Sequence, residues 1–184
     1  MLAIATGAPL LLAGLARAPF DDPGEGQHAE IARELSRSRD PFRLTLNGVP
    51  YLDKPPLLYA FAAAAFTLGG EREGTARAVP ALAALAAVGA TAWLGARLLG
   101  GRGGFVAGAA LLTSAGFFAF SRYVRPETLF VASLAGGFAL ALTGLAEERR
   151  GRVVAGLALF GIAALAKDPL GALAPPLVIG LALA

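Results

Sequence analysis

Apolar runs separated by short polar turns dominate the chain after residue 77. Such runs occur at about 78–99, 105–120, 126–146 and 153–166, and another begins at Leu170 and continues to Ala184. Runs of this kind predict membrane-spanning helices, because a helix needs about 17–25 residues to cross the hydrocarbon core. The last run has no polar end, so we expect the sequence to be the N-terminal part of a longer protein.

The first apolar run, from Leu2 to Ala16, is short for a span but can reach the interface through the tail that ends at Phe20. A signal peptide is the alternative, because Leu15–Ala18 is similar to a small-residue cleavage site. Signal peptides begin with a positively charged segment, which this sequence lacks, so we expect a first span over residues 1–20.

Residues 21–77 form the main polar stretch and contain 9 of the 13 acidic residues. Within this stretch, Ile31, Ala32 and Leu35 fall on one face of a helix over residues 27–38. The pattern predicts a short amphipathic helix that lies on a membrane surface. Most of the chemistry of the protein is expected in this polar stretch.

A loop over residues 40–54 is expected next, and Pro55-Pro56 then allows a second helix to begin and run over 57–68. This apolar helix has about 13 residues, or roughly 20 Å, which is too short for a hydrocarbon core of about 30 Å. We therefore expect it to lie along the membrane boundary without crossing.

The side on which each turn lies follows from the number of crossings. Two short turns between the predicted spans share one side and contain five arginines: Arg97, Arg102, Arg149, Arg150 and Arg152. The positive-inside rule places these turns in the cytoplasm. Residues 21–77 and the polar turns at 121–127 and 167–168 are then expected together on the extracytoplasmic side.

Composition agrees with an integral membrane protein. Hydrophobic residues make up 56% of the 184 residues before the 24 glycines are added, against about 45–50% in soluble domains with glycine included. Charged residues make up only 16%, against about 25%. The surplus is too large for the interior of a soluble domain of this length. The basic residues stand at the ends of apolar runs, so membrane lipids and not nucleic acid are the expected surroundings.

The first polar cluster is Asp21–Glu25, directly before the amphipathic helix. Asp22 at the N-cap, Pro23 at the first helical position and Glu25 at the third would form a capping box, which is a structural role. Alternatively, Asp22 or Glu25 is a carboxylate held at a membrane surface, able to act as a general base or to hold a divalent cation. The two interpretations are compatible, because a helix N-terminus favours anionic groups nearby.

The second cluster surrounds Lys54, which with Lys167 is one of only two lysines among 16 basic residues. Lys54 follows Asp53 and directly precedes the short boundary helix. There its ammonium group could meet a lipid phosphate as a point charge. The alternative is a lysine that only extends from a membrane edge toward water.

The third cluster combines the turn at 121–127 with Lys167 and Asp168. Pro126 is a natural helix start, and Glu127 at the beginning of that helix is favoured by the helix dipole alone. Each of these residues taken singly is typical of capping. Their predicted location on the same membrane face as Lys54 makes a shared site the stronger interpretation.

The only histidine, His28, lies on the amphipathic helix. The chain has no second histidine and no cysteine, so a zinc site would need carboxylates as its other ligands. We expect His28 to be solvated or interfacial. The glycine-rich stretch at 100–104 lies in a turn between spans and not at a strand-to-helix junction, which excludes a phosphate-binding loop.

Four stretches resemble the N-terminal part of the membrane glycosyltransferases of family 39 and their aminoarabinose-transferase and protein-mannosyltransferase relatives. The most specific is the run Asn-Gly-Val-Pro-Tyr-Leu-Asp-Lys-Pro-Pro, and the four stretches are Asp22–Glu34, Leu46–Tyr59, Ala76–Pro80 and Leu165–Pro169. The resemblance implies an all-α, GT-C-like bundle of transmembrane helices, with a large first extracytoplasmic loop that carries juxtamembrane helices. On this basis residues 1–20 are the first span, 21–77 the catalytic loop and 78–184 further spans, truncated at the end.

The same resemblance implies roles for single residues. The family usually has Asp-Glu in this loop, and Gly24 here occupies the position of its catalytic Asp, while Glu25 occupies that of the Glu. Glu25 or Asp22 would therefore have to serve as the catalytic carboxylate. Lys54 matches the family's lysine that contacts the carrier phosphate, and Asp53 matches the acidic position before that lysine. Glu127 matches the acidic residue of the family's second loop.

The implied activity is transfer of a sugar from a polyprenyl-phosphate carrier to a lipid, glycan or protein acceptor on the outer face of the cell (inner or plasma) membrane. No cofactor is expected, other than a divalent cation near Asp53 or Glu127. Three alternatives stay open: a membrane transporter, a non-catalytic assembly subunit, and a truncated glycosyltransferase without activity of its own. The clustering of charged residues at span boundaries disfavours the transporter, whose ion path would place them inside spans.

Overall fold

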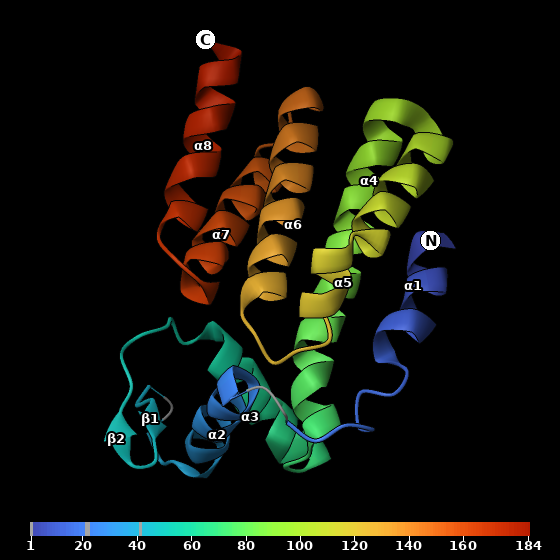
Figure 1. Cartoon of the computed structure of the whole chain (residues 1–184). Helices are drawn as coiled ribbons and strands as arrows, with labels where there is room; N and C mark the ends of the chain where they lie inside the picture. The colour runs from blue at the N-terminus through green and yellow to red at the C-terminus, as the bar shows by residue number, and fades with distance from the viewer. Residues whose placement is uncertain (1, 21–22, 41) are drawn as a thin grey trace.

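The computed structural model describes residues 2–20, 23–40 and 42–184 and is almost entirely helical. Its elements in chain order are α1 (Leu2–Leu12), α2 (Pro23–Arg37), β1 (Thr45–Leu46), β2 (Val49–Pro50), α3 (Leu57–Gly69), α4 (Glu73–Thr113), α5 (Ala115–Phe120), α6 (Glu127–Ala146), α7 (Arg150–Ala166) and α8 (Leu170–Leu183). Figure 1 shows two parts: a bundle made by α1 and α4–α8, and a smaller layer of α2, α3 and the two strands at one end of it.

Helices α4 and α6 are each long and apolar enough to cross a membrane. Helix α4 contains two helical halves that meet at a bend, where Gly100 has a φ of 78° that favours glycine. The halves approach so closely that a Cβ on Gly95 would lie 2.9 Å from the Cβ of Ala107. The bend confirms the predicted turn between the runs at 78–99 and 105–120, and the chain breaks again at Ser114 before α5.

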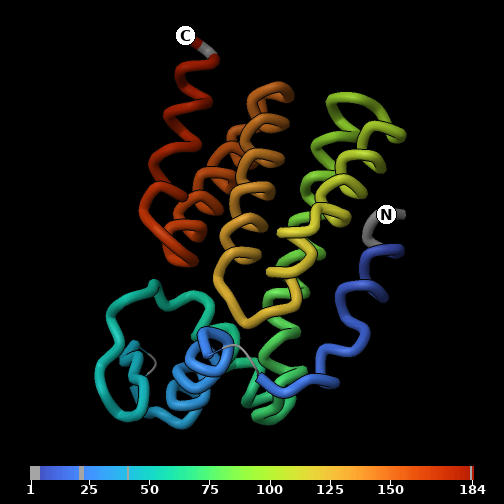
Figure 2. The backbone as a smooth tube through the Cα atoms, viewed as in Figure 1, coloured from blue at the N-terminus to red at the C-terminus, as the bar shows by residue number. Residues whose placement is uncertain are grey.

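Figures 1 and 2 show that the turns of the bundle fall at its two opposite ends. The bend at Gly100 and the α6–α7 turn lie at one end. The α5–α6 and α7–α8 turns lie toward the other end, together with α2, α3 and the strands. The predicted grouping at one end is therefore present in the fold for residues 121–127, 167–168 and the described part of 21–77. Which side of the membrane this end faces stays a prediction.

The amphipathic helix and the short apolar helix are both confirmed, as α2 and α3. Their apolar faces pack on each other, α3 also packs on α4, and both helices share one buried core with the start of α6 and the end of α7. The core includes Ile31 and Leu35 from α2, and Leu58, Tyr59 and Ala62 from α3. Helix α3 has 13 residues and lies at the end of the bundle beside α2, which agrees with a helix that does not cross.

The segment expected to be a loop over 40–54 instead contains a two-stranded antiparallel hairpin. Thr45 pairs with Pro50, and Leu46 pairs with Val49. The turn residues Asn47 and Gly48 have φ values of 52° and 77°. Asn-Gly with both residues in the left-handed region is the preferred two-residue hairpin turn, which explains why the chain reverses here.

The first predicted span, over residues 1–20, forms a shorter helix than expected. Helix α1 has 11 residues and contains Pro9. The chain leaves the helix by Gly14, whose φ of 74° is again in the left-handed region. Arg122 holds this end of α1, because its guanidinium donates to the carbonyls of Leu10, Leu11 and Ala13 at 2.8, 3.1 and 2.7 Å.

Candidate active site

Glu25, in the first turn of α2, is fully buried and paired with Arg77 of α4. Arg77 donates from Nε to Oε1 at 2.8 Å and from Nη2 to Oε2 at 2.7 Å. The backbone N–H of Val124 adds a third hydrogen bond to Oε1 at 3.1 Å. Charge-assisted bonds in this two-point geometry are strong and directional. Glu25 therefore joins the start of α2 to α4 and to the α5–α6 turn.

Arg77 also reaches the segment that connects α1 with α2. Its guanidinium donates to the carbonyls of Leu15, Ala18 and Pro19 at 2.9, 2.6 and 3.0 Å, and it lies 5.1 Å from the ring centre of Phe20. The stretch Ala76–Pro80 is one of the four that resemble the glycosyltransferase family, but the resemblance implied no role for Arg77. The only local signal was one arginine among apolar residues at the start of a long helix.

This geometry bears on the choice between Glu25 and Asp22. Both oxygens of Glu25 are held by Arg77, and the side chain has no exposed surface, which is a structural role different from the predicted capping box. A general base must come within hydrogen-bond reach of the proton that it accepts. Asp22 lies outside the described residues, and its catalytic role stays a prediction.

Lys54 and Asp53 lie together at the surface between β2 and α3. The ammonium Nζ of Lys54 is 3.5 Å from Oδ2 of Asp53, and the two side chains are 45% and 70% exposed. The hydroxyl of Tyr51 donates to the same Oδ2 at 3.3 Å. The Lys54 ammonium is therefore accessible at the polar end of the bundle, as binding of a phosphate there would require.

An aromatic pair connects this surface with α2. The ring of Tyr51 meets that of Tyr59 edge-on with centroids 5.9 Å apart, and the Tyr59 hydroxyl shares a hydrogen bond of 2.9 Å with Nδ1 of His28. Burial, followed by the hydrogen bond with Tyr51, raises the pKa of Tyr59 well above its usual value of 10.0. His28 is buried between α2 and α3, so the expectation of a solvated or interfacial histidine is wrong. The cause is the hydroxyl of Tyr59, which offers its ring a partner inside the core.

Glu127 and Lys167 lie where α6 begins and α7 ends. Their side chains approach to 3.6 Å between Nζ and Oε1, and the Lys167 ammonium stands 6.0 Å from the ring centre of Phe130. Within the described part of the chain, the other oxygen of Glu127 and the hydroxyl of Thr128 are buried without a hydrogen-bond partner. Glu127 therefore has an acceptor oxygen that the surrounding protein leaves unused.

The three polar clusters surround one apolar core. The cluster of Lys54 lies a few residues before Leu58 and Tyr59 in the chain, and the cluster of Glu127 and Lys167 adjoins Leu129 and Ala166. All four of these apolar residues are buried in that core. The Glu25 cluster reaches the same core through Val124. No three His, Cys, Asp or Glu side chains converge as a metal cluster within the described ranges.

The fold and this polar end layer define an all-α integral membrane protein of the GT-C type. Two solved structures of ArnT from Cupriavidus metallidurans, one in the apo state and one bound to undecaprenyl phosphate, each match with a TM-score of 0.90 and 27% sequence identity. The matches cover 98% of this chain and 35% or 34% of those chains. The chain thus spans about a third of the length of the structures that it matches.

Residues 53–184 match the model of the dolichyl-phosphate-mannose-protein mannosyltransferase family, and the chain belongs to that family. The match begins at Asp53 and so includes Lys54, α3 and helices α4–α8. A comparison with curated proteins gives no significant match.

Proposed function

We propose that this chain is the N-terminal part of a membrane glycosyltransferase that takes its sugar from a polyprenyl-phosphate carrier. The observation that carries the proposal is the likeness over nearly the whole chain to ArnT, one of whose structures is bound to undecaprenyl phosphate. The exposed ammonium of Lys54 at the polar end of the bundle supports it, because a compact cation of this kind suits a phosphate. The acceptor is a lipid, glycan or protein.

The polar end is proposed to face the outer side of the cell (inner or plasma) membrane. At the opposite end, Glu147 pairs with Arg97, Arg149 and Arg152, and the exposed Arg102 and Arg150 lie in the same two turns. Short turns with an excess of arginine stay in the cytoplasm. The end that carries Lys54 and Glu127 would then be extracytoplasmic.

In the proposed reaction, a hydroxyl or amine of the acceptor attacks the anomeric carbon of the sugar. The bond between that carbon and the phosphate oxygen breaks, and the polyprenyl phosphate leaves with the bonding electrons. Asp22 accepts the proton of the acceptor, because Arg77 already engages both oxygens of Glu25. Lys54 stabilises the charge on the departing phosphate, an interaction that is commonly worth about 3–4 kcal/mol.

A divalent cation near Asp53 or Glu127 would support this site. Glu127 fits such a role through its buried, unused oxygen, whereas Asp53 already accepts a hydrogen bond from Tyr51 and lies beside Lys54. When bound, the cation would offset part of the negative charge of the carrier phosphate. In the proposed reaction, Lys54 binds the phosphate with or without the cation.

The test is sugar transfer by the full-length protein in membrane vesicles supplied with a polyprenyl-phosphate sugar. Lys54→Ala is expected to lower the rate about 10²–10³-fold, because it removes the charge that meets the leaving group. Arg39→Ala, which removes an exposed cation of the same polar stretch, is the matched control and is expected to retain activity. Unchanged transfer by Lys54→Ala would overturn the proposal.

The base is identified in the same assay. Asp22→Asn is expected to lower the rate about 10²–10⁴-fold, the range of a lost general base, with the amount of folded protein unchanged. Glu25→Gln is expected to lower the amount of folded protein instead. A fully active Asp22→Asn variant would reject Asp22 as the base.

A further inference from the structure

We propose that Glu34 is a positioning residue, which sets the position of Lys54 by holding the hairpin turn against α2. This inference rests on the proposed role of Lys54 in binding the carrier phosphate. Lys54 is half-exposed and lies on a segment with little secondary structure, so contacts from another part of the protein must hold it in place.

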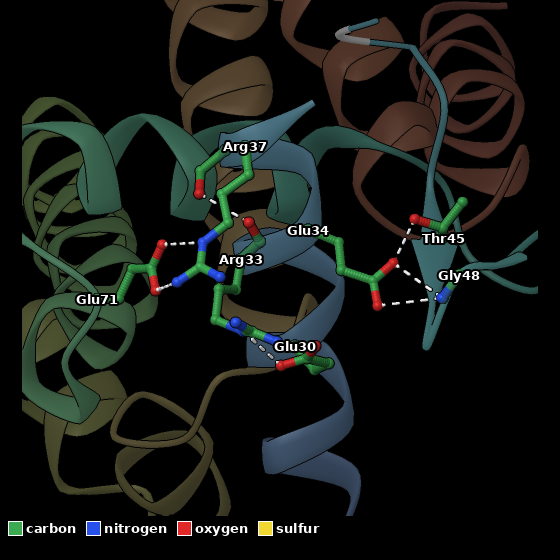
Figure 3. A network of polar contacts seen from close by, with 8 residues as sticks. Glu30, Arg33, Glu34, Arg37, Thr45, Gly48 and Glu71 are labelled. Carbon is green, nitrogen blue, oxygen red and sulfur yellow. Dashed lines mark hydrogen bonds and ion pairs between the residues drawn. The ribbon is translucent and has the colours of Figure 1, made fainter. Parts of the chain in front are cut away.

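Figure 3 shows the contacts that carry the inference. Glu34 points from α2 to the hairpin, where its Oε2 accepts a hydrogen bond from the hydroxyl of Thr45. The backbone N–H of Gly48 lies 3.2 Å from Oε1 and 3.3 Å from Oε2 of the same carboxylate. One side chain therefore binds the first strand and the turn together.

The hairpin needs this support because it is very small. Each strand has two residues, and a single two-stranded hairpin is at best marginally stable in water. Val49 in the second strand is exposed, so little apolar burial holds that strand. Helix α2 is fixed by Ile31 and Leu35 in the core, to which Leu46 of the first strand also packs, and Glu34 links this helix to the turn.

The hairpin leads directly to the lysine. Tyr51, the residue after β2, continues the ladder by donating its N–H to the carbonyl of Leu44 at 2.9 Å. The side chain of Tyr51 then donates to Asp53 and packs edge-on against Tyr59. A rotation of the hairpin would move Tyr51 and Asp53, and with them the ammonium of Lys54.

Two neighbouring ion pairs on α2 show why Glu34 is the specific contact. Arg37 pairs with Glu71, which lies after α3, so it holds the far end of α3 and not the Lys54 segment. Glu30 pairs with Arg33 within α2 itself. Glu30 is thus a matched control: the same residue type, one turn away on the same helix, with a partner on its own helix.

The test compares Glu34→Ala, Glu34→Gln and Glu30→Ala in the full-length protein. A nitroxide label on Leu52→Cys, with any cysteine outside this chain replaced, reports the motion of the segment, because Leu52 is 94% exposed and this chain has no native cysteine. Glu34→Ala is expected to make the label several-fold more mobile. It should also lower kcat/KM for the carrier sugar about 10–100-fold, mostly through KM, because misplacement of a binding group is costly.

Glu34→Gln keeps a carbonyl oxygen that accepts from Thr45 or Gly48, and it is expected to recover most of the lost affinity and rigidity. Glu30→Ala should leave both unchanged. Equal label mobility in Glu34→Ala and Glu30→Ala, or an unchanged KM in Glu34→Ala, would overturn the inference. These outcomes are independent of Lys54→Ala: if that variant transfers sugar normally, the proposed function fails whatever the label reports.

Discussion

Arg77 and Glu25 are 52 residues apart in the sequence and form a buried, two-point ion pair at the end of the bundle. The pair joins the starts of α2 and α4, and the N–H of Val124 adds the α5–α6 turn to the same carboxylate. The polar layer is therefore fastened to the bundle by charge and hydrogen bonds as well as by its apolar core.

Glu25→Gln is expected to destabilise the protein by about 3–5 kcal/mol, because it removes the carboxylate charge that neutralises the buried guanidinium of Arg77. Thermal unfolding of the detergent-solubilised protein measures this. Arg33→Gln breaks a part-exposed pair on α2 and should change stability far less, because solvent screens such a pair. Equal shifts for the two variants would contradict a structural role for the Arg77–Glu25 pair.

Tyr59 is expected to stay protonated at about pH 11, where an ordinary tyrosine has ionised. Burial is the main cause of the raised pKa, so the folded protein keeps this proton at pH values at which the unfolded chain loses it. The folded state is therefore expected to lose stability as the pH rises above 10.0, the usual pKa of the group. Ultraviolet titration of the folded protein checks this. The Tyr59→Phe variant should show the same ionisation amplitude as the parent, and a smaller amplitude in the variant would refute the expectation.

The contact between α6 and α7 depends on glycine. A Cβ on Gly156 of α7 would lie 2.7 Å from the backbone nitrogen of Ala141 on α6, whereas Gly161 on the same helix has nothing within 4 Å. Gly156→Ala is therefore expected to destabilise the protein by about 1–3 kcal/mol, because the helices must move apart. Gly161→Ala should not destabilise it. Comparable unfolding temperatures for both variants would argue against this close packing.

The Arg37–Glu71 pair predicts a dependence of stability on pH. The hydrogen bond with Arg37 lowers the pKa of Glu71 below its usual 4.5 in the folded state. The stabilisation is therefore present above that value and is lost as the pH falls through the lowered pKa. Glu71→Gln should be less stable than the parent at pH 7, and this difference should shrink below about pH 4. A difference that does not change with pH would be inconsistent with the pair.

Local patterns in the sequence predicted most of the elements. The spacing of Ile31 and Leu35 located α2, Pro55-Pro56 located the start of α3, and glycines after Leu99 marked the bend of α4. The hairpin was missed although Asn47-Gly48 is a strong turn signal, because its strands are too short to show an alternating pattern.

The contacts of the site could not be predicted in the same way. The partner of Glu25 is 52 residues away and that of His28 is 31 residues away, so neither pair leaves a trace in helical or strand periodicity. A capping box and a buried ion pair use the same glutamate, and only the three-dimensional packing distinguishes them. Lys54 and Glu127 were singled out because lysine and isolated carboxylates are rare in this apolar chain and because they match positions of the family that the sequence resembles. Their roles stay predictions.

Labelling of single cysteines with a membrane-impermeant maleimide tests the central claim most directly, because this chain has no native cysteine. Lys54→Cys and Glu127→Cys in the full-length protein, with any cysteine outside this chain replaced, should both react from the outside of intact cells. Arg102→Cys, in the bend at the opposite end, should react only after permeabilisation. Reaction of positions 54 and 127 from opposite sides would contradict a shared extracytoplasmic site.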